Sequence, residues 1–186
     1  MFSYKIDNKI SLKLLEKNNA EELFELIDST RSYLKEWLGW LDKMKELEDA
    51  QSFINDSRKQ FAENNGFQAG IWYKEQLVGI IGLHEIDWED KKTEIGSWLD
   101  QNHQGNGIVT KSCKHILNYC FDNLELNKVE IHCAEQNSKS RAVPERLGFT
   151  KEGVIREAQL LYDRFVNHVV YGMLRQEWEK CEKQTR

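Results

Sequence analysis

The chain has 186 residues, a mass of 22.0 kDa and a formal net charge of −5. Hydrophobic residues make up 40% and charged residues 31% of it, which is the balance of a globular protein long enough to bury a substantial core. The negative charge argues against general nucleic-acid binding, which needs a basic surface to replace phosphate counterions, and suits a cationic substrate.

The sequence has no visible domain boundary and no targeting segment. It contains one proline and no Ser/Gly/Pro-rich tract, so we expect a single domain over 1–186. The N-terminus lacks the apolar stretch of a signal peptide, and no later run is apolar enough to span a bilayer. We therefore expect a cytoplasmic protein without a membrane partner. The four cysteines lack paired spacing, and Cys113, Cys120 and Cys133, which lie on a predicted helix stripe or strand, are expected in the core. The five histidines lack ligand spacing, so we predict no metal site.

The first half of the chain alternates between helix and strand patterns. Apolar spacing predicts, in chain order, a strand, a helix, an irregular segment, a second helix and two strands (10–15, 20–28, 29–41, 47–64, 67–73 and 77–85). The irregular segment 29–41 is rich in large apolar residues, which could belong to the core or line a substrate cleft.

A strand, a glycine turn and a long helix follow, over 93–99, 100–107 and 108–124. Gly105 and Gly107 allow positive φ at the mouth of the helix, where unpaired N–H groups and the helix dipole favour a phosphate. A P-loop or a dinucleotide fingerprint would need a small residue where Thr110 stands, so both nucleotide motifs are disfavoured.

The last third is predicted to return to the sheet. A strand over 128–134 should lie parallel to 93–99 after a right-handed crossover. A short helix over 137–147 should be distorted by Pro144. Two further strands joined by a long loop and a fraying tail complete the prediction (149–155, 168–174 and 177–186).

The run QGNGIVT at 104–110 resembles the pyrophosphate loop of the GCN5-related N-acetyltransferases (GNAT), although Val109 stands where Gly or Ala is usual. Four other segments resemble the RimJ/RimL-like branch, which acetylates the N-termini of ribosomal proteins (94–100, 137–143, 145–149 and 171–178). The resemblance covers about 10–178. It implies an α/β (α+β) GNAT fold, a single mixed, mostly antiparallel sheet of about seven strands flanked by helices, with a central splayed parallel strand pair.

The resemblance also implies an enzyme, an acyltransferase that moves an acetyl group from acetyl-CoA to a primary amine through a tetrahedral intermediate. The expected acceptor is the N-terminal α-amine of a ribosomal protein, and a homodimer is left open. A backbone N–H near Trp98 is the expected oxyanion donor. The implied cofactor-binding residues lie on the loop, on a strand edge and at a helix start (Ser97, Trp98, Leu99, Gln104, Gly105, Asn106, Gly107, Ile108, Val109, Thr110, Asn137 and Ser140).

Glu94 is the expected catalytic base, because it shares a strand face with Gly96 and Trp98. Neutralising an α-amine at pH 7 costs roughly 1 kcal/mol, against about 4.6 kcal/mol for a lysine, so an N-terminal acceptor needs only a weak base. An ordinary ion pair is the alternative role for Glu94. The resemblance implies Ser140 as the acid, because it aligns with the family's serine in the Asn137-x-x-Ser140 turn, although a Ser at a helix start can simply be a cap.

One departure from the RimL pattern affects the mechanism. Gln159 stands where that branch has a glutamate, so Glu94 or Glu157 must substitute, or the acceptor differs. His84 and His132 are expected to be structural histidines on strands. Two other functions remain open. The acidic helix face 21–28 would suit a small amine such as a polyamine or an amino-sugar, and the missing glutamate would suit a CoA-binding module without turnover.

Overall fold

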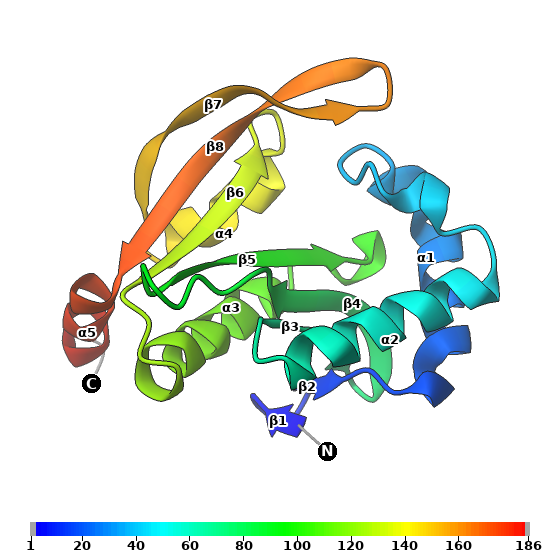
Figure 1. The fold of residues 1–186 in the computed structure, drawn as a ribbon, viewed down its shortest axis with the longest axis horizontal. Coiled ribbons are helices and arrows are strands. Elements are labelled where there is room, and N and C mark those ends of the chain that lie inside the picture. Colours follow the sequence, from blue (N-terminus) through cyan, green and yellow to red (C-terminus); the bar gives the residue numbers. More distant parts are fainter. Residues whose placement is uncertain (1–2, 185–186) are drawn as a thin grey trace.

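The computed structural model describes residues 3–184, which form an eight-stranded sheet flanked by helices (Figure 1). The strand order is β1-β2-β3-β4-β5-β6-β8-β7. The strands are β1 (Ser3–Lys5), β2 (Ile10–Leu14), β3 (Phe67–Tyr73), β4 (Gln76–Leu83), β5 (Lys92–Leu99), β6 (Lys128–Ala134), β7 (Thr150–Leu161) and β8 (Arg164–Leu174). The helices are α1 (Ala20–Leu34), α2 (Leu47–Ala62), α3 (Ile108–Asn118), α4 (Ser138–Arg146) and α5 (Arg175–Gln184). Short helical turns are η1 (Lys17–Asn19), η2 (Leu41–Lys43), η3 (Gln101–His103) and the π turn η4 (Tyr119–Asn123) that extends α3.

The sheet confirms the predicted fold class. All neighbouring strands are antiparallel except β5 and β6, which are parallel and pair only at Lys92↔Lys128, Thr93↔Val129 and Glu94↔Glu130. Beyond these three pairs the two strands splay apart, as the resemblance implied. The described sheet has one strand more than expected, because the short β1 adds to its β2 edge.

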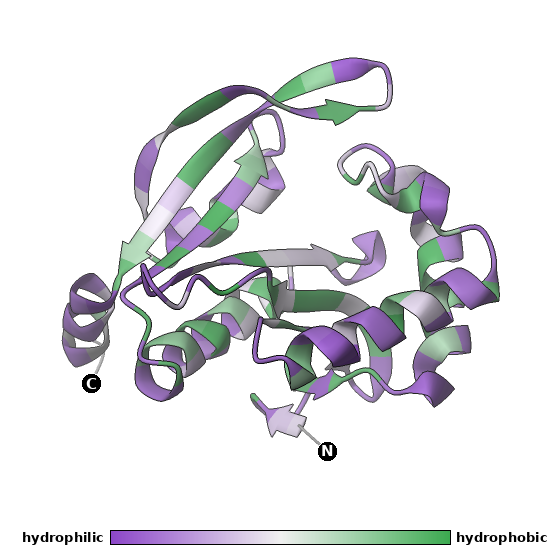
Figure 2. Ribbon diagram, in the orientation of Figure 1, coloured by the Kyte–Doolittle hydropathy of each residue, from purple (hydrophilic) through white to green (hydrophobic). Residues whose placement is uncertain are grey.

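Two apolar cores lie on opposite faces of the sheet. One packs α1 and α2 against residues such as Trp72 and Ile80, and the other packs α3 and α5 against residues such as Ile71 and Ile81. Neighbouring residues of one strand enter different cores because successive side chains point to opposite faces. Figure 2 shows hydrophilic residues on the outer face of α2 and a largely hydrophobic β4. As predicted, Cys113, Cys120 and Cys133 are buried, free thiols.

The prediction for 29–41 was partly wrong, because α1 continues to Leu34. Thr30 is buried there and donates its hydroxyl to the carbonyl of Leu26, at 2.7 Å. The guanidinium of Arg31 donates to the carbonyls of Leu41 and Met44, at 2.9 and 2.6 Å, and so holds the following turn against the helix. The two Arg31 contacts are tertiary, and they stabilise a helical turn whose apolar spacing is irregular.

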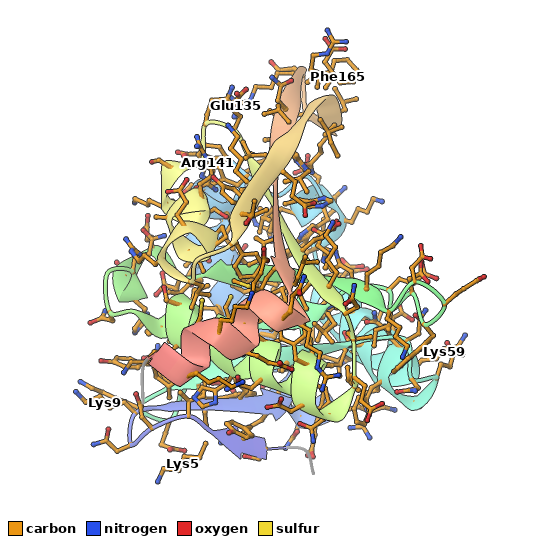
Figure 3. The ribbon with its side chains drawn as sticks, turned by 90° about the vertical axis from the view of Figure 1, so that its left-hand side faces the viewer. Lys5, Lys9, Lys59, Glu135, Arg141 and Phe165 are labelled. Carbon is orange, nitrogen blue, oxygen red and sulfur yellow. The ribbon has the colours of Figure 1, made fainter. Side chains whose placement is uncertain are left out.

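The long loop predicted before β8 was also wrong, because β7 and β8 are long strands joined by a two-residue turn. A bulge between Ile155 and Gln159 interrupts the alternation of β7, which hides the strand in the sequence. The hairpin reaches across to the segment after α1, where the Tyr162 hydroxyl donates to the carbonyl of Leu38 at 3.0 Å (Figure 1). Figure 3 shows Phe165 at the far end of this hairpin, with 61% of the residue exposed.

The predicted fraying tail is the helix α5 as far as the structure describes it, and 185–186 lie outside the described residues. Trp178 is only 5% exposed, and its indole N–H donates to Asn118 Oδ1 at 2.8 Å. This one aromatic anchor attaches an otherwise polar helix to α3. No helix within 3–184 combines the length and apolar character needed to cross a bilayer.

Candidate active site

The strands β5 and β6 diverge near the centre of the molecule (Figure 1), and a large groove lies between them. Its volume is about 1190 Å³. Its walls come from the end of α1 and the turn after it, the inner edges of β5 and β6, the glycine loop with the start of α3, and one side of α4. Most of the site residues predicted from sequence lie along it (Glu94, Ser97, Trp98, Leu99, Gln104, Gly105, Gly107, Ile108, Val109, Thr110, Asn137 and Ser140).

The glycine loop has the geometry of an anion site. Gly105 and Gly107 have φ of 77° and 69°, and a side-chain carbon on either would meet nothing within 4 Å, so conformation rather than space requires glycine. The N–H of Lys111 donates to the carbonyl of Gly107 at 3.0 Å and makes the first bond of α3. The N–H groups of 108–110 therefore have no acceptor earlier in the helix, and they lie at the positive end of its dipole.

Asn106 and Gln104 stabilise the loop from either side. The Asn106 amide donates to the carbonyl of His103 at 3.0 Å, so this predicted cofactor-binding residue supports the loop instead of lining the groove. Gln104 donates to the Tyr33 hydroxyl at 2.5 Å and accepts from Lys139 Nζ at 2.9 Å. The Gln104 side chain thus joins α1 to α4 beside the groove.

The edge of β5 offers main-chain groups to the groove. The N–H of His84 donates to the carbonyl of Glu94 at 2.9 Å, and the N–H of Asp100 donates to the carbonyl of Val78 at 2.8 Å. In an antiparallel pair the peptide groups alternate in direction, so those of Glu94, Gly96 and Trp98 face β4. Those of Ser97 and Leu99 face the groove, where β6 has already diverged. The expected oxyanion donor near Trp98 is therefore the groove-facing N–H of Ser97 or Leu99, because the N–H of Trp98 itself faces β4.

Asn137 and Ser140 lie at the start of α4, on the β6 side of the groove. Asn137 is the cap of this helix, and its Oδ1 accepts from the N–H of Ser140 at 3.0 Å. The Ser140 hydroxyl is not used in capping and donates to Cys133 Sγ at 3.2 Å. Burial raises the pKa of Cys133 to about 11, so this partner is a neutral thiol at pH 7. The Ser140 hydroxyl can therefore turn to another acceptor at little electrostatic cost.

Glu94 lies between two histidines. Its Oε1 is 3.6 Å from His84 Nδ1, and its Oε2 is 3.4 Å from His132 Nδ1. A side-chain carbon at Gly96 would collide with the His84 ring, so the glycine makes room for that ring. Both histidines were expected to be structural, and both line the groove. The sequence held one usable signal for His132, which shares the polar face of β6 with Glu130, whereas His84 lies just after the end of β4.

Gln159 and His168 complete the polar end of the groove. Gln159 Oε1 is 3.2 Å from His168 Nε2. Burial, reinforced by the neighbouring His132, lowers the pKa of His168 and so favours its neutral form. Glu157, the other carboxylate considered as a base, does not line the groove; its N–H donates to Asn167 Oδ1 at 2.9 Å. Within 3–184, no group of three or more His, Cys, Asp or Glu side chains is arranged to hold a metal ion.

We expect the stability of the protein to depend on pH through His84. The nearby Glu94 carboxylate raises the pKa of His84, although burial opposes it. The protonated ring therefore stabilises the fold below the unfolded pKa of about 6.5, and this contribution is lost as pH rises through the raised pKa. Because the side chain is 52% exposed, solvent screening limits the effect to about 0.5 kcal/mol or less.

Urea unfolding at pH 5.5 and pH 8.5 would measure this contribution. The wild-type protein should lose more stability between the two pH values than His84→Asn does, because the variant has no titrating ring at this position. Equal losses in the two proteins would contradict the ion pair.

Comparison with known proteins agrees with this geometry. The model of the acetyltransferase (GNAT) domain family matches residues 9–150. YdaF of Bacillus subtilis (strain 168), provisionally named a ribosomal N-acetyltransferase, is 41% identical over 182 residues, which cover 96% of this chain and 98% of YdaF. The ribosomal-protein-serine acetyltransferase of Escherichia coli (strain K12) is 26% identical over 170 residues, with 91% and 95% covered.

A solved structure of a similar protein supports acetyl-CoA as the cofactor. The microcin C7 self-immunity acetyltransferase MccE, in complex with acetyl-CoA and AMP, has a TM-score of 0.88 and 29% sequence identity. The match covers 91% of this chain and 94% of MccE. The family model and the YdaF match each span most of this chain. The chain therefore belongs to the GNAT acetyltransferase family, and it is an acetyl-CoA-dependent N-acetyltransferase.

Proposed function

We propose that the acceptor is the N-terminal α-amine of a ribosomal protein. The observation that carries this proposal is the polar end of the groove, where one carboxylate, Glu94, is the single acidic side chain among the described groove-lining residues. One carboxylate suits the removal of one proton from one amine. The names of YdaF and of the Escherichia coli relative support a ribosomal protein as the acceptor.

The same observation disfavours a polyamine. A polyamine carries several positive charges, each of which gains from an acidic partner when it leaves water. The groove also presents Lys139 and Arg146, which would repel such a ligand. The acidic residues of α1 that motivated this alternative do not line the groove. A peptide N-terminus places only one charge near Glu94.

In the proposed mechanism the glycine loop binds the pyrophosphate of acetyl-CoA. The N–H groups of 108–110 would donate to it, as expected at a helix N-terminus. The pantetheine arm is peptide-like and would pair with the main-chain groups of Ser97 and Leu99, with Asn137 nearby as a further amide partner. A groove-facing N–H of the same edge would donate to the thioester oxygen as it becomes negative.

Glu94 would take the proton from the neutral amine as it attacks, and Ser140 would protonate the departing thiolate and recover its own proton from water. The amine nitrogen attacks the acetyl carbonyl carbon, a C–N bond forms and the C–S bond breaks. The loss of one amine proton to Glu94 balances the proton that the sulfur receives. Because an α-amine needs only roughly 1 kcal/mol to become neutral at pH 7, a carboxylate suffices as base. We further propose that this single-domain enzyme acts in the cytoplasm, where such acceptors are made.

A panel of acceptors tests the proposal directly. Purified enzyme and acetyl-CoA would be incubated with peptides copied from ribosomal-protein N-termini, the same peptides with blocked N-termini, spermidine and glucosamine. Mass spectrometry should find one added acetyl group on the free peptide N-terminus. Acetylation of the blocked peptides at lysine, or faster turnover of spermidine, would refute the proposed acceptor without affecting the family assignment.

A further inference from the structure

The last paired position of β5 and β6 places two carboxylates beside each other. Glu94 and Glu130 are register partners in this parallel pair, so their side chains leave the same face of the sheet. Two carboxylates at neighbouring positions repel unless a cation or a proton lies between them. The next residue on this face of β6 is His132, at the point where the strands begin to diverge.

The His132 ring bridges the two carboxylates. Its Nδ1 is 3.4 Å from Glu94 Oε2, and its Nε2 is 2.9 Å from Glu130 Oε2. A neutral imidazole has one N–H and one lone pair, so it can donate to one carboxylate while it accepts a proton from the other. An imidazole with an acid–base group at each nitrogen is a route for a proton.

Glu130 connects this route to solvent. Its side chain is 24% exposed, and its Oε1 is 2.7 Å from Lys128 Nζ. Partial burial alone would raise the pKa of Glu130, but the hydrogen bonds from Lys128 and His132 outweigh it and lower the pKa. A carboxylate that stays ionised releases a received proton readily to water.

We propose that His132 and Glu130 relay the proton that Glu94 takes from the acceptor amine. This inference rests on the proposed role of Glu94. Glu94 passes the proton to His132 Nδ1, the ring releases its Nε2 proton to Glu130, and Glu130 releases a proton to water. Exchange with water then restores the starting tautomer. The proposal gives His132 and Glu130 no contact with the reacting atoms, so they are positioning residues that act through Glu94.

The groove explains why the proton on Glu94 needs a route to solvent through other side chains. Its side chain is 28% exposed, but the acceptor and the acyl-carrying arm would fill the groove and displace the water beside it. The other groups that face Glu94 and His132 come from the residue after β4, from β8 and from α4. His84 is an ion-pair partner of Glu94, His168 is held neutral by burial, and Ser140 faces Cys133. His132 alone among these contacts a second carboxylate, as far as the described residues go.

The test compares His132→Gln and Glu130→Gln with a matched control. The control is Glu152→Gln, because Glu152, like Glu130, contacts Lys128 at 2.7 Å but does not contact His132. We expect each relay variant to lower kcat about tenfold, a modest share of a general-base effect, with the KM for acetyl-CoA unchanged. The double variant should be no slower than the slower single variant, because the two groups act in series. Glu152→Gln should retain wild-type kcat.

Added imidazole provides a second readout that a structural role would not give. It should restore part of the kcat of His132→Gln, since a free imidazole can accept the proton from Glu94. Wild-type kcat in His132→Gln, the same loss in Glu152→Gln as in Glu130→Gln, or no response to imidazole would each overturn the relay. If instead Glu94→Gln keeps full activity, the base assignment itself fails, which is a separate outcome.

Discussion

Replacing Glu94 by Gln is expected to lower kcat about a hundredfold at pH 7, near the low end of the range for general acid–base catalysis. The low end applies because roughly a tenth of an α-amine is already neutral at this pH. Glutamine has the same shape and cannot accept the proton. The KM for acetyl-CoA should stay within about twofold, since no phosphate or pantetheine contact is proposed for this side chain.

The loss in Glu94→Gln should shrink toward pH 9, where the amine is neutral without help. Thiol release measured with a chromogenic reagent at several pH values would follow this trend. Glu157→Gln is the matched control, because Glu157 is the other carboxylate that the sequence offered and it does not line the groove. An inactive Glu157→Gln beside an active Glu94→Gln would reverse the assignment.

Gly107→Val should weaken acetyl-CoA binding by about a hundredfold while the protein still folds. A β-branched residue is strongly disfavoured at the φ of 69° found here, so the loop must change its backbone path. Two misdirected hydrogen bonds to a charged phosphate, at about 1.5 kcal/mol each, account for a loss of this size. Isothermal titration with coenzyme A would measure the change in Kd.

Gly153→Val provides the control for this variant. Gly153 lies in β7 without a positive φ, and a side-chain carbon there also meets nothing within 4 Å. The two substitutions add the same group in open space and differ in the backbone conformation that they enter. A Kd that is unchanged in Gly107→Val would show that the N–H groups at the start of α3 do not bind the diphosphate.

Local patterns in the sequence were enough to determine the central unit of this protein. The alternation in β5 and β6, the glycines at 105 and 107 and the apolar stripe of α3 depend on neighbours in the chain, so they can be read directly. These elements form the groove, and Glu94 and Ser140 lie in it as expected. The right-handed crossover rule gave the direction of β6, and the resemblance to GNAT enzymes added the splayed pair.

Long-range contacts decided the rest. The end of α1 depends on carbonyls ten and more residues away, α5 depends on one tryptophan that contacts Asn118, and a bulge hides the length of β7. His132 acquired its place between Glu94 and Glu130 only through the register of two strands more than thirty residues apart in the chain. A sequence specifies which residues can titrate, but the pairing of strands decides which of them meet, because hydrogen bonding and ion pairing require contact in space.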